Sequence, residues 1–369
     1  MKELRPRLTY LTCARMPTEK AHGISIAHMC AAFAAEGGHV KLVVPTRRNL
    51  IVEDVFSYYG VPQSFSVRLI SSIDFVGRGW THPFFFFIQR LCFVRAARRA
   101  GIDRGIIYTR EPEIVAAFAE THTVVYEAHR WPRGFAGWLT ALFIRKAALV
   151  VCNSHGTESA VRKAGIPQTI VAPNGFDPAL FAQPVPDRSV LSLPEGVVAL
   201  YVGSAAPWKG IGIVRAAARE LTASGVSIAI VGNDAPVERE GVLVELGRIS
   251  PCRVPAYLQS ADILLLPNTK VSEESERFTS PIKLFEYLAA GKAIVASDLP
   301  SIREILGPDD ALFVPPGDAL ALASAIGRLA ADETARTALA ERSRALALRY
   351  TWQARAKCVI HTLNIHGHE

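Results

Sequence analysis

Short apolar runs alternate with helix-like segments along nearly the whole chain. In its first half, strand-like runs at residues 7–13, 39–45 and 106–109 are separated by helical segments that include 25–36 and 84–100. Apolar runs of this length are typical of strands covered on both faces, and strands that are joined through helices run parallel. The alternation therefore predicts an α/β fold in which parallel sheets carry helices on both faces.

The remaining expected elements follow the same alternation. Strands are predicted at 123–126, 149–152, 169–172, 197–202, 226–231, 263–266 and 293–296, and helices at 112–120, 135–148, 154–164, 211–223, 254–260, 319–331 and 334–348. After residue 172 the pattern is interrupted by Asn174-Gly175 and by Pro184, Pro186 and Pro194. A chain of 369 residues is long enough for two doubly wound domains, and a ligand is expected in the cleft between them.

Composition narrows the classes of protein to consider. Half of the residues are hydrophobic (50%) and a fifth are charged (20%), as in a globular protein. The 6 cysteines are scattered and form no C-x-x-C pair, which favours a reducing cytoplasm over a disulfide framework or a zinc site. The first residues lack the apolar core of a signal peptide, and no run of about twenty apolar residues could span a membrane. We therefore expect a cytoplasmic protein.

Positive charge is concentrated in the first half of the chain. Residues 1–178 contain 22 Lys and Arg against 13 Asp and Glu, whereas residues 179–369 contain 19 against 21. The basic half is expected to meet an anionic surface or substrate. Nucleic acid is not an expected partner, because no known nucleic-acid-binding motif accompanies the charge.

Part of this charge surrounds an aromatic run. The segment from Arg78 to Arg104 contains six Arg and one acid around Phe84-Phe85-Phe86-Phe87. One interpretation is that this basic, aromatic helix makes peripheral contact with anionic lipid at the inner membrane surface. The other is that the Phe run belongs to the protein core.

A helix followed by a buried strand is encoded by the run ERFTSPIKLFEYLAAGKAIVASDLPS, residues 276–301. Ser280 followed by Pro281 predicts the start of the helix, with Ser280 as N-cap and Pro281 at the first helical position. Gly291 predicts its end.

Two charged residues share one face of this predicted helix. Lys283 and Glu286 are three residues apart and close to its start. The N–H groups and the dipole of a helix N-terminus favour anions, so a phosphate could bind there while Glu286 accepts from sugar hydroxyls. The alternative is an ordinary helix with a surface Glu.

The run Ser280 to Tyr287, SPIKLFEY, resembles the donor-site signature of GT-B glycosyltransferases in the retaining GT4 family, the glycosyl transferases group 1. Glu286, Gly291 and Ala296-Ser297 match the family pattern. Phe278 stands where the family usually has a first Glu, which leaves open which group faces the donor sugar. The resemblance implies two Rossmann-like doubly wound domains that face a central cleft.

The resemblance covers nearly the whole chain. VAPNGFDPALF at residues 171–181 is similar to the family's interdomain segment, and RYTWQARA at residues 349–356 is similar to its terminal helix. It implies an acceptor-side domain over residues 1–178 and a donor domain over residues 179–349. The last helix, at about 350–366, is expected to pack back onto the first domain.

The resemblance also implies which residues bind the donor. Lys209 matches the Lys of the family loop that grips the diphosphate, and Ser204 takes the place of its Arg, which Lys283 would partly replace. A Lys at the mouth of a parallel sheet can neutralise a leaving diphosphate, although it can also be an ordinary solvated lysine. The full set of expected donor-binding residues is Gly23, Gly203, Ser204, Lys209, Arg248, Ile249, Ser280, Pro281, Lys283 and Glu286.

Further candidates lie in the first half. His129 ends a Tyr-Glu-Ala-His run at a strand terminus, where the family often has a functional His near the reacting sugar; a neutral His can orient a hydroxyl or move a proton. The alternative is a hydrogen-bonded His at the rim of the sheet. Gly23 opens the first helix after a loop in which the family approaches phosphates and acceptor. Acceptor-side contacts are expected from Lys20, His22, Arg110 and Glu111.

The implied activity is transfer of a sugar from a nucleotide diphosphate sugar to a hydroxyl acceptor, with retention of configuration. His129, Lys209 and Glu286 are the expected catalytic residues. No cofactor or metal is expected, because no D-x-D motif stands out. Two alternatives remain open: a nucleotide-sugar epimerase on the same fold, and a non-catalytic nucleotide-sugar-binding protein.

Overall fold

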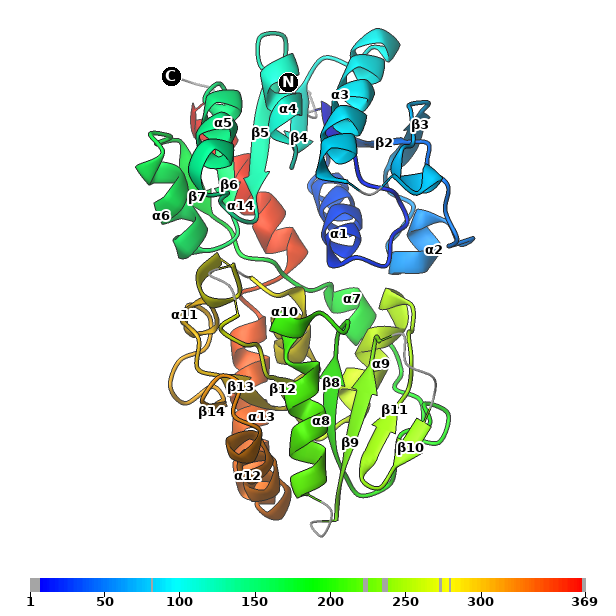
Figure 1. Ribbon diagram of the computed structural model, residues 1–369, viewed down its shortest axis with the longest axis vertical. Coiled ribbons are helices and arrows are strands. Elements are labelled where there is room, and N and C mark those ends of the chain that lie inside the picture. The colour runs from blue at the N-terminus through cyan, green and yellow to red at the C-terminus, as the bar shows by residue number, and fades with distance from the viewer. Residues whose placement is uncertain are drawn as a thin grey trace. The chain divides into compact units, whose positions relative to one another are not determined.

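The computed structural model describes residues 7–80, 82–221, 225–233, 238–271, 274–278 and 280–366. The chain divides into two compact units. Unit 1 comprises Met1–Pro173 with Trp352–Glu369, and unit 2 comprises Asn174–Thr351. Each unit is built around one sheet with helices packed on it (Figure 1).

The described strands of unit 1 form one parallel sheet in the order β3-β2-β1-β4-β5-β6-β7. They are β1 (Arg7–Leu11), β2 (His39–Pro45), β3 (Ser66–Ile70), β4 (Ile106–Thr109), β5 (Thr123–Ala128), β6 (Leu149–Cys152) and β7 (Thr169–Val171). The strand order reverses between β1 and β4, which pair with Tyr10 opposite Tyr108. In open α/β sheets, ligands bind beyond the carboxyl ends of the strands at such a reversal.

The helices of unit 1 bury apolar residues against this sheet. They are α1 (Ala21–Ala35), α2 (Val55–Tyr59), α3 (Pro83–Ala100), α4 (Pro112–Phe118), α5 (Gly134–Ile144), α6 (His155–Lys163) and α14 (Trp352–His366), with a 3₁₀ turn at Val76–Arg78. Helices α3 to α6 share one core with the strands, through residues such as Phe93, Val115 and Val161. Helix α14 packs against α1, where the rings of Trp352 and His28 stack.

Unit 2 repeats this architecture with one antiparallel edge strand. Its described strands lie in the order β10-β11-β9-β8-β12-β13-β14, and only β10 pairs antiparallel. They are β8 (Val197–Val202), β9 (Val226–Val231), β10 (Glu238–Glu240), β11 (Leu243–Glu245), β12 (Ile263–Leu266), β13 (Ala293–Ser297) and β14 (Leu312–Val314). The order reverses between β8 and β12, as it does between β1 and β4.

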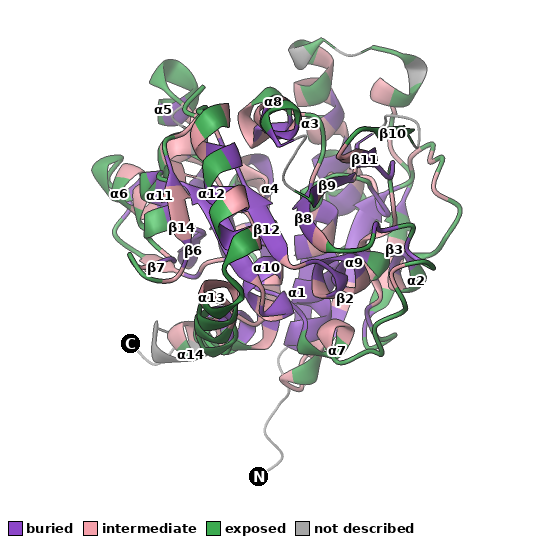
Figure 2. Cartoon of the chain, turned by 90° about the horizontal axis from the view of Figure 1, so that it is seen from below, coloured by how far each residue is buried: buried purple, intermediate pink, exposed green. Residues whose placement is uncertain are grey.

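Helices cover both faces of the second sheet. They are α7 (Pro178–Phe181), α8 (Ile211–Glu220), α9 (Val254–Ser260), α10 (Ile282–Ala290), α11 (Pro300–Arg303), α12 (Ala319–Ala331) and α13 (Glu333–Ala347), with 3₁₀ turns at Pro207–Lys209 and Pro251–Arg253 and a π turn at Glu274–Phe278. Alternate residues of β8 enter two different cores, Leu200 with α9 and α10, and Tyr201 with α8 and α12. In Figure 2 the strands are buried, whereas α12 and α13 show exposed outer faces.

For many elements, above all the strands buried on both faces, the residue bounds predicted from the sequence are those of the structure. The bounds expected for β2, β4, β6, β8, β9, β12, α9 and α12 are those observed. The expectations omit α2, α7, α11, β3, β10, β11 and β14. The edge strands were missed for a physical reason, because β3 and β10 are largely exposed and carry polar residues instead of an apolar run.

Candidate functional site

The loop between β8 and α8 lies where the second sheet reverses its strand order. It is held against the residues after β12, because Thr269 N donates to Trp208 O (2.9 Å). Gly210 has φ of 79°, and a Cβ there would lie 1.8 Å from Pro267 O. Only glycine fits this close approach in a left-handed conformation. The loop therefore has a defined position at the carboxyl edge of the sheet.

Lys209 ends this loop with its side chain partly shielded from solvent. Its Nζ donates to Ser204 Oγ (2.9 Å) and lies 5.4 Å from the centre of the Trp208 ring. Burial lowers the pKa of Lys209 below its usual range. The structure thus brings together Lys209 and Ser204, the two residues expected at the family's Lys and Arg positions.

Helix α10 starts later than the sequence predicts. It begins at Ile282, Pro281 is its N-cap residue, and no side chain caps it, so the assignment of Ser280 as N-cap and of Pro281 as first helical residue is wrong. The Ser280 hydroxyl is engaged elsewhere, because it accepts from Asn174 N (3.2 Å), while Asn174 Nδ2 donates to Ser280 O (2.6 Å). The expected end at Gly291, with φ of 61°, is confirmed.

Tyr287 fixes α10 across the strand reversal, a role the sequence did not reveal. Its buried hydroxyl accepts from Val202 N (3.0 Å) and donates to Leu265 O (3.1 Å), which lie on β8 and β12. The helix face that carries Lys283 and Glu286 is thereby held beside the β8–α8 loop.

Lys283 has the most unfavourable environment in this region. Its Nζ is buried without a hydrogen-bond partner and lies 4.6 Å from the centre of the Tyr201 ring. Burial and the positive charge of Lys209 hold the pKa of Lys283 well below its usual range. An ammonium in this position lacks the anion that would stabilise it.

Glu286 lies one turn further along the same face. Its side chain is half-buried, and burial raises its pKa to about 7. A carboxylate held here without a positive partner suits acceptance of hydroxyl hydrogens from a bound ligand. Phe278, where the family has its first Glu, lies in the π turn before α10, which contacts α11.

The Gly247-Arg248-Ile249 loop also lies at the carboxyl edge of the second sheet, next to β9. Gly247 O accepts from Gly232 N (2.8 Å), so this loop lies beside the end of β9. Arg248 is exposed, and Ile249 packs partly against the core. Gly203, at the start of the β8–α8 loop, is bound to the end of β9 through Val231 O (2.8 Å).

Several buried polar atoms at this edge have no hydrogen-bond partner. Besides Lys283 Nζ they include Asn233 Oδ1, after β9, and Asn268 Oδ1, after β12. Buried polar atoms in folded proteins are nearly always hydrogen-bonded, so a ligand is the expected partner. The motif-based reasoning missed both Asn residues, although each directly follows an apolar strand and one further residue.

In unit 1, a buried carboxylate organises the end of β5. Glu127 Oε2 accepts from the Tyr10 hydroxyl (3.0 Å), and Oε1 lies 2.7 Å from Arg355 Nη2 and 2.9 Å from His129 Nε2. Burial alone would raise the pKa of Glu127, but the charges of Arg355 and Arg110 and the hydrogen bond from His129 outweigh it and hold this pKa well below its usual range. Because Arg355 belongs to α14, this cluster joins the chain's last helix to β5.

His129 is held neutral within this cluster. Burial, aided by the charge of Arg110, lowers its pKa to about 4, although Glu127 acts in the opposite direction. With the carboxylate next to Nε2, the neutral ring keeps its proton there and leaves Nδ1 as an acceptor. Such a ring can receive a hydrogen bond from a hydroxyl.

Arg110 and His22 complete this edge of unit 1. Arg110 directly follows β4, and its Nη1 is buried without a partner. His22 lies in the first turn of α1, and burial together with the charges of Arg110 and Lys20 lowers its pKa to about 3. These groups gather where the first sheet reverses, whereas Lys20 itself is exposed.

Glu111 is occupied by structural contacts. Its carboxylate accepts from Thr12 Oγ1 (2.8 Å), Cys13 N (2.9 Å) and Thr109 Oγ1 (3.1 Å), and burial raises its pKa. It thus ties the end of β1 to the end of β4. The acceptor-side role of Glu111 stays a prediction.

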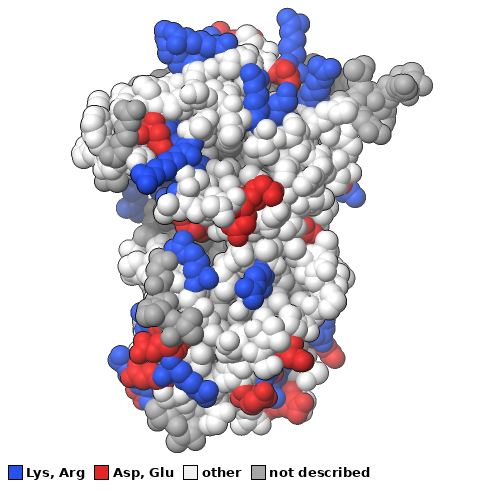
Figure 3. Space-filling model, turned by 90° about the vertical axis from the view of Figure 1, so that its right-hand side faces the viewer, with Lys and Arg blue, Asp and Glu red and all other residues white. Residues whose placement is uncertain are grey.

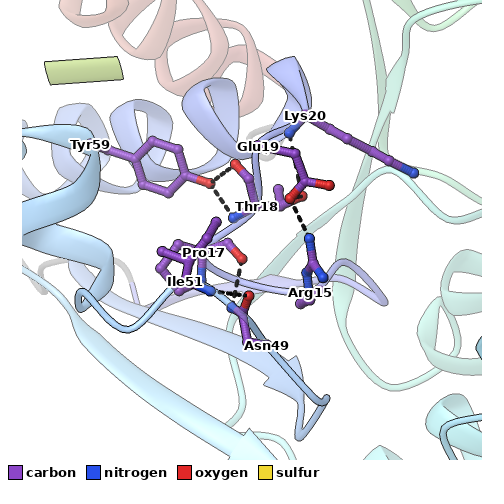
Figure 4. A network of polar contacts seen from close by, with 8 residues as sticks. All are labelled: Arg15, Pro17, Thr18, Glu19, Lys20, Asn49, Ile51 and Tyr59. Atoms are coloured by element: carbon purple, nitrogen blue, oxygen red, sulfur yellow. Dashed lines mark hydrogen bonds and ion pairs between the residues drawn. The ribbon is translucent and has the colours of Figure 1, made fainter. Parts of the chain in front are cut away.

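The loop before α1 is fixed by a polar network (Figure 4). The Tyr59 hydroxyl donates to Thr18 O and accepts from Thr18 N, both at 2.8 Å, while Asn49 Nδ2 donates to Pro17 O (2.8 Å). The sequence predicted that Gly23 opens α1, but the helix begins at Ala21 and Gly23 lies in its first turn. A Cβ on Gly23 would lie 2.0 Å from the Tyr59 hydroxyl oxygen. This glycine therefore has a packing reason of its own.

Two features are absent from the described residues. They contain no group of three or more His, Cys, Asp or Glu side chains arranged to hold a metal ion. Nor does any helix in the described ranges have the length and hydropathy needed to cross a membrane.

Parts of the sequence are similar to known glycosyltransferases. Residues 196–332 match the family described as Glycosyl transferases group 1. A phosphatidyl-myo-inositol mannosyltransferase of Mycolicibacterium smegmatis is 35% identical over 192 residues, which are 49% of this chain and 47% of that protein. The chain spans less than half the length of the curated relatives it matches.

Two solved structures resemble nearly the whole chain. Sucrose-phosphate synthase from Thermosynechococcus elongatus has a TM-score of 0.76 at 19% identity, over 97% of this chain and 98% of that one. HepE from Anabaena, solved with UDP-glucose, has a TM-score of 0.71 at 18% identity. The similarity covers 98% of this chain and 100% of that one. With two Rossmann-like α/β units, the chain therefore has the GT-B fold of these glycosyltransferases.

Proposed function

We propose that this chain is a glycosyltransferase that moves a hexosyl group from a nucleotide diphosphate sugar to a hydroxyl acceptor. The observation that carries the proposal is the desolvated lysine pair of unit 2, Lys209 and Lys283, of which Lys283 lacks a hydrogen-bond partner. A bound diphosphate would restore to both the counter-charge that water no longer supplies. A UDP-sugar in HepE and the name of the mannosyltransferase relative support this donor class.

The other site residues have roles that follow from their surroundings. As the glycosidic bond breaks, negative charge grows on the diphosphate, and Lys209 and Lys283 would stabilise it. Glu286, one turn deeper, would accept from ribose hydroxyls. His129, in unit 1, would orient the acceptor hydroxyl through Nδ1. We further propose retention of configuration through a front-face displacement assisted by the leaving phosphate, with no metal required.

A ligand panel followed by a product assay tests the proposal. Thermal unfolding with UDP, GDP, ADP and dTDP sugars should show a rise in melting temperature with at least one of them, because a ligand that binds only the folded state stabilises it. Nucleoside diphosphate should then be released in proportion to hydroxyl acceptor, equally with and without EDTA. NMR of the product should show the donor's anomeric configuration.

Other outcomes identify the alternatives. Epimerised sugar without any acceptor would indicate an epimerase, and binding without diphosphate release would indicate a non-catalytic binding protein. Inverted product would contradict the front-face displacement.

A further inference from the structure

Helix α5 turns an apolar face toward solvent. Phe135, Trp138 and Leu142 are 74%, 60% and 38% exposed, and their spacing places them on one side of the helix. The Phe135 and Trp138 rings stack with centroids 5.5 Å apart. A helix packed on a sheet normally presents polar residues outward, so an apolar outer face indicates an interaction surface.

Helix α3 adds a second set of exposed apolar residues. Phe84, Phe86 and Leu91 are 58%, 43% and 39% exposed, whereas Phe93 is fully buried. The interpretation of the Phe run as core is therefore wrong for Phe84 and Phe86. Helix α4 packs against both α3 and α5, and Figure 1 shows the three helices on one side of the unit. We call the exposed residues of α3 and α5 the α3–α5 surface.

Basic residues border the α3–α5 surface. Arg95, Arg98 and Arg99 are exposed on α3, and residues 130–146, which include α5, contain four basic residues and no acidic one. Nearby acids already face cations: Glu113 pairs with Arg90, Glu120 with Lys146 and Asp103 with Lys41. Figure 3 shows Lys and Arg gathered on part of the surface of unit 1.

We propose that the α3–α5 surface docks unit 1 onto an anionic phospholipid bilayer. Exposed Phe and Trp suit the interfacial region of a bilayer, and the surrounding Arg side chains suit its negative surface potential. A second protein chain would explain the apolar residues but not the excess of positive charge, because a copy of this surface would repel it.

Docking has a consequence for the acceptor. His129 precedes the start of α5 by five residues, so the candidate acceptor edge and the apolar start of α5 are adjacent along the chain. A hydroxyl carried by a membrane-resident amphiphile would therefore reach the edge where His129 lies. This step rests on the proposed function, whereas docking itself does not.

Vesicle binding tests the docking. The full chain should co-sediment at low salt with phosphatidylcholine vesicles that contain phosphatidylglycerol, and much less with pure phosphatidylcholine. Phe135→Ser with Trp138→Ser should weaken partitioning about tenfold through lost apolar burial. Arg95→Gln with Arg98→Gln and Arg99→Gln should weaken it on the order of a hundredfold, since each basic residue contributes about fivefold. Leu320→Ser with Leu348→Ser removes two exposed apolar residues of unit 2 and should change nothing.

The outcomes separate docking from the proposed function. Circular dichroism and the thermal shift with nucleotide should match the wild type in every variant, because the substituted side chains are exposed and lie outside the donor site. Absence of wild-type co-sedimentation overturns the docking, as does equal partitioning of the α5 variant and the unit 2 control. A dimer that the α5 variant abolishes, without vesicle binding, would identify a second copy as the occupant and also overturn it. Vesicle binding without any response to nucleotides would leave the docking intact and contradict the proposed function.

Discussion

At the scale of single residues, unfavourable environments identify the site better than motifs do. Lys283, Asn233 and Asn268 each bury a polar atom without a partner, at the edge where the second sheet reverses. Folded proteins rarely leave such atoms unpaired unless a ligand completes them. The lysine pair and Glu286 could be predicted from the sequence, because they lie within recognisable local motifs. The Glu127–Arg355 contact could not, because its two residues come from distant parts of the chain and no local pattern joins them.

The first prediction separates two roles in the donor site. Lys209→Ala should lower kcat about a hundredfold or more, because its charge acts on negative charge that grows in the transition state. Glu286→Ala should raise the donor KM more than it lowers kcat, since ribose contacts are similar in ground and transition states. Steady-state kinetics would show the difference. A fully active Lys209→Ala together with a Glu286→Ala impaired only in kcat would reverse the two assignments.

The second prediction concerns pH. Folding raises the pKa of Glu286 from its ordinary 4.5 to about 7, so between these values the folded protein holds a proton that the unfolded chain releases. This group therefore costs the unliganded protein stability as pH rises through that window, by up to about 3 kcal/mol. Urea unfolding at several pH values should show the wild type losing stability relative to Glu286→Gln.

The matched control for this effect is Glu304→Gln, which alters an exposed carboxylate of unit 2. Its unfolding is measured over the same pH range. If the difference between Glu286→Gln and the wild type does not change with pH, burial does not perturb Glu286.

At the scale of elements, two glycines that lie two residues apart allow the effects of the same substitution on stability to be compared directly. Gly210→Ala would place a Cβ 1.8 Å from Pro267 O at φ of 79°, so the β8–α8 loop must shift. We expect a loss of about 1–3 kcal/mol in the free energy of unfolding, together with weaker nucleotide binding. Gly212→Ala, in α8 with open space around its Cβ, should be neutral or stabilising by up to about 1 kcal/mol. Denaturant unfolding of both variants measures this, and equal effects would contradict the loop geometry.

The last helix supplies the second comparison of elements. Arg355 is buried, donates to Ala172 O (3.0 Å) and pairs with Glu127. Arg355→Met leaves the Glu127 carboxylate without its main counter-charge and should cost about 3–5 kcal/mol. Lys357→Met, on an exposed face of the same helix, should cost less than about 0.5 kcal/mol. Similar losses in the two variants would mean that α14 is held by its apolar contacts alone.

The first and last residues of a strand could be predicted from the sequence where both faces of the strand are buried. Strands such as β8 and β12 are buried throughout and stand out as apolar runs. The start of α10 was placed one residue early, because Asn174 takes the Ser280 hydroxyl that would otherwise cap the helix. A distant hydrogen bond of this kind leaves no local trace in the sequence.

At the scale of the whole molecule, the two units share the same kind of strand reversal but differ in the residues that they carry. Unit 2 has the buried lysines and matches the Glycosyl transferases group 1 family over residues 196–332, whereas unit 1 has the neutral histidines and the α3–α5 surface. Part of the excess of positive charge in the first half of the sequence lies in the basic border of that surface. Donor recognition by unit 2 is the central claim from which the other roles follow.

Calorimetric titration of UDP, GDP, ADP and dTDP into three proteins tests this claim most directly. The proteins are the wild type, Lys283→Met and a control, Lys292→Met, which alters a half-buried lysine at the opposite edge of the same sheet. We expect at least one diphosphate to bind the wild type and the control equally, and Lys283→Met at least about tenfold more weakly. Repeating the titration in buffers of different ionisation enthalpy should reveal proton uptake on binding, because a diphosphate restores the lowered pKa of Lys283, and Lys283→Met should reduce that uptake. Equal affinity and equal uptake in all three proteins, or no binding of any diphosphate, would contradict the account.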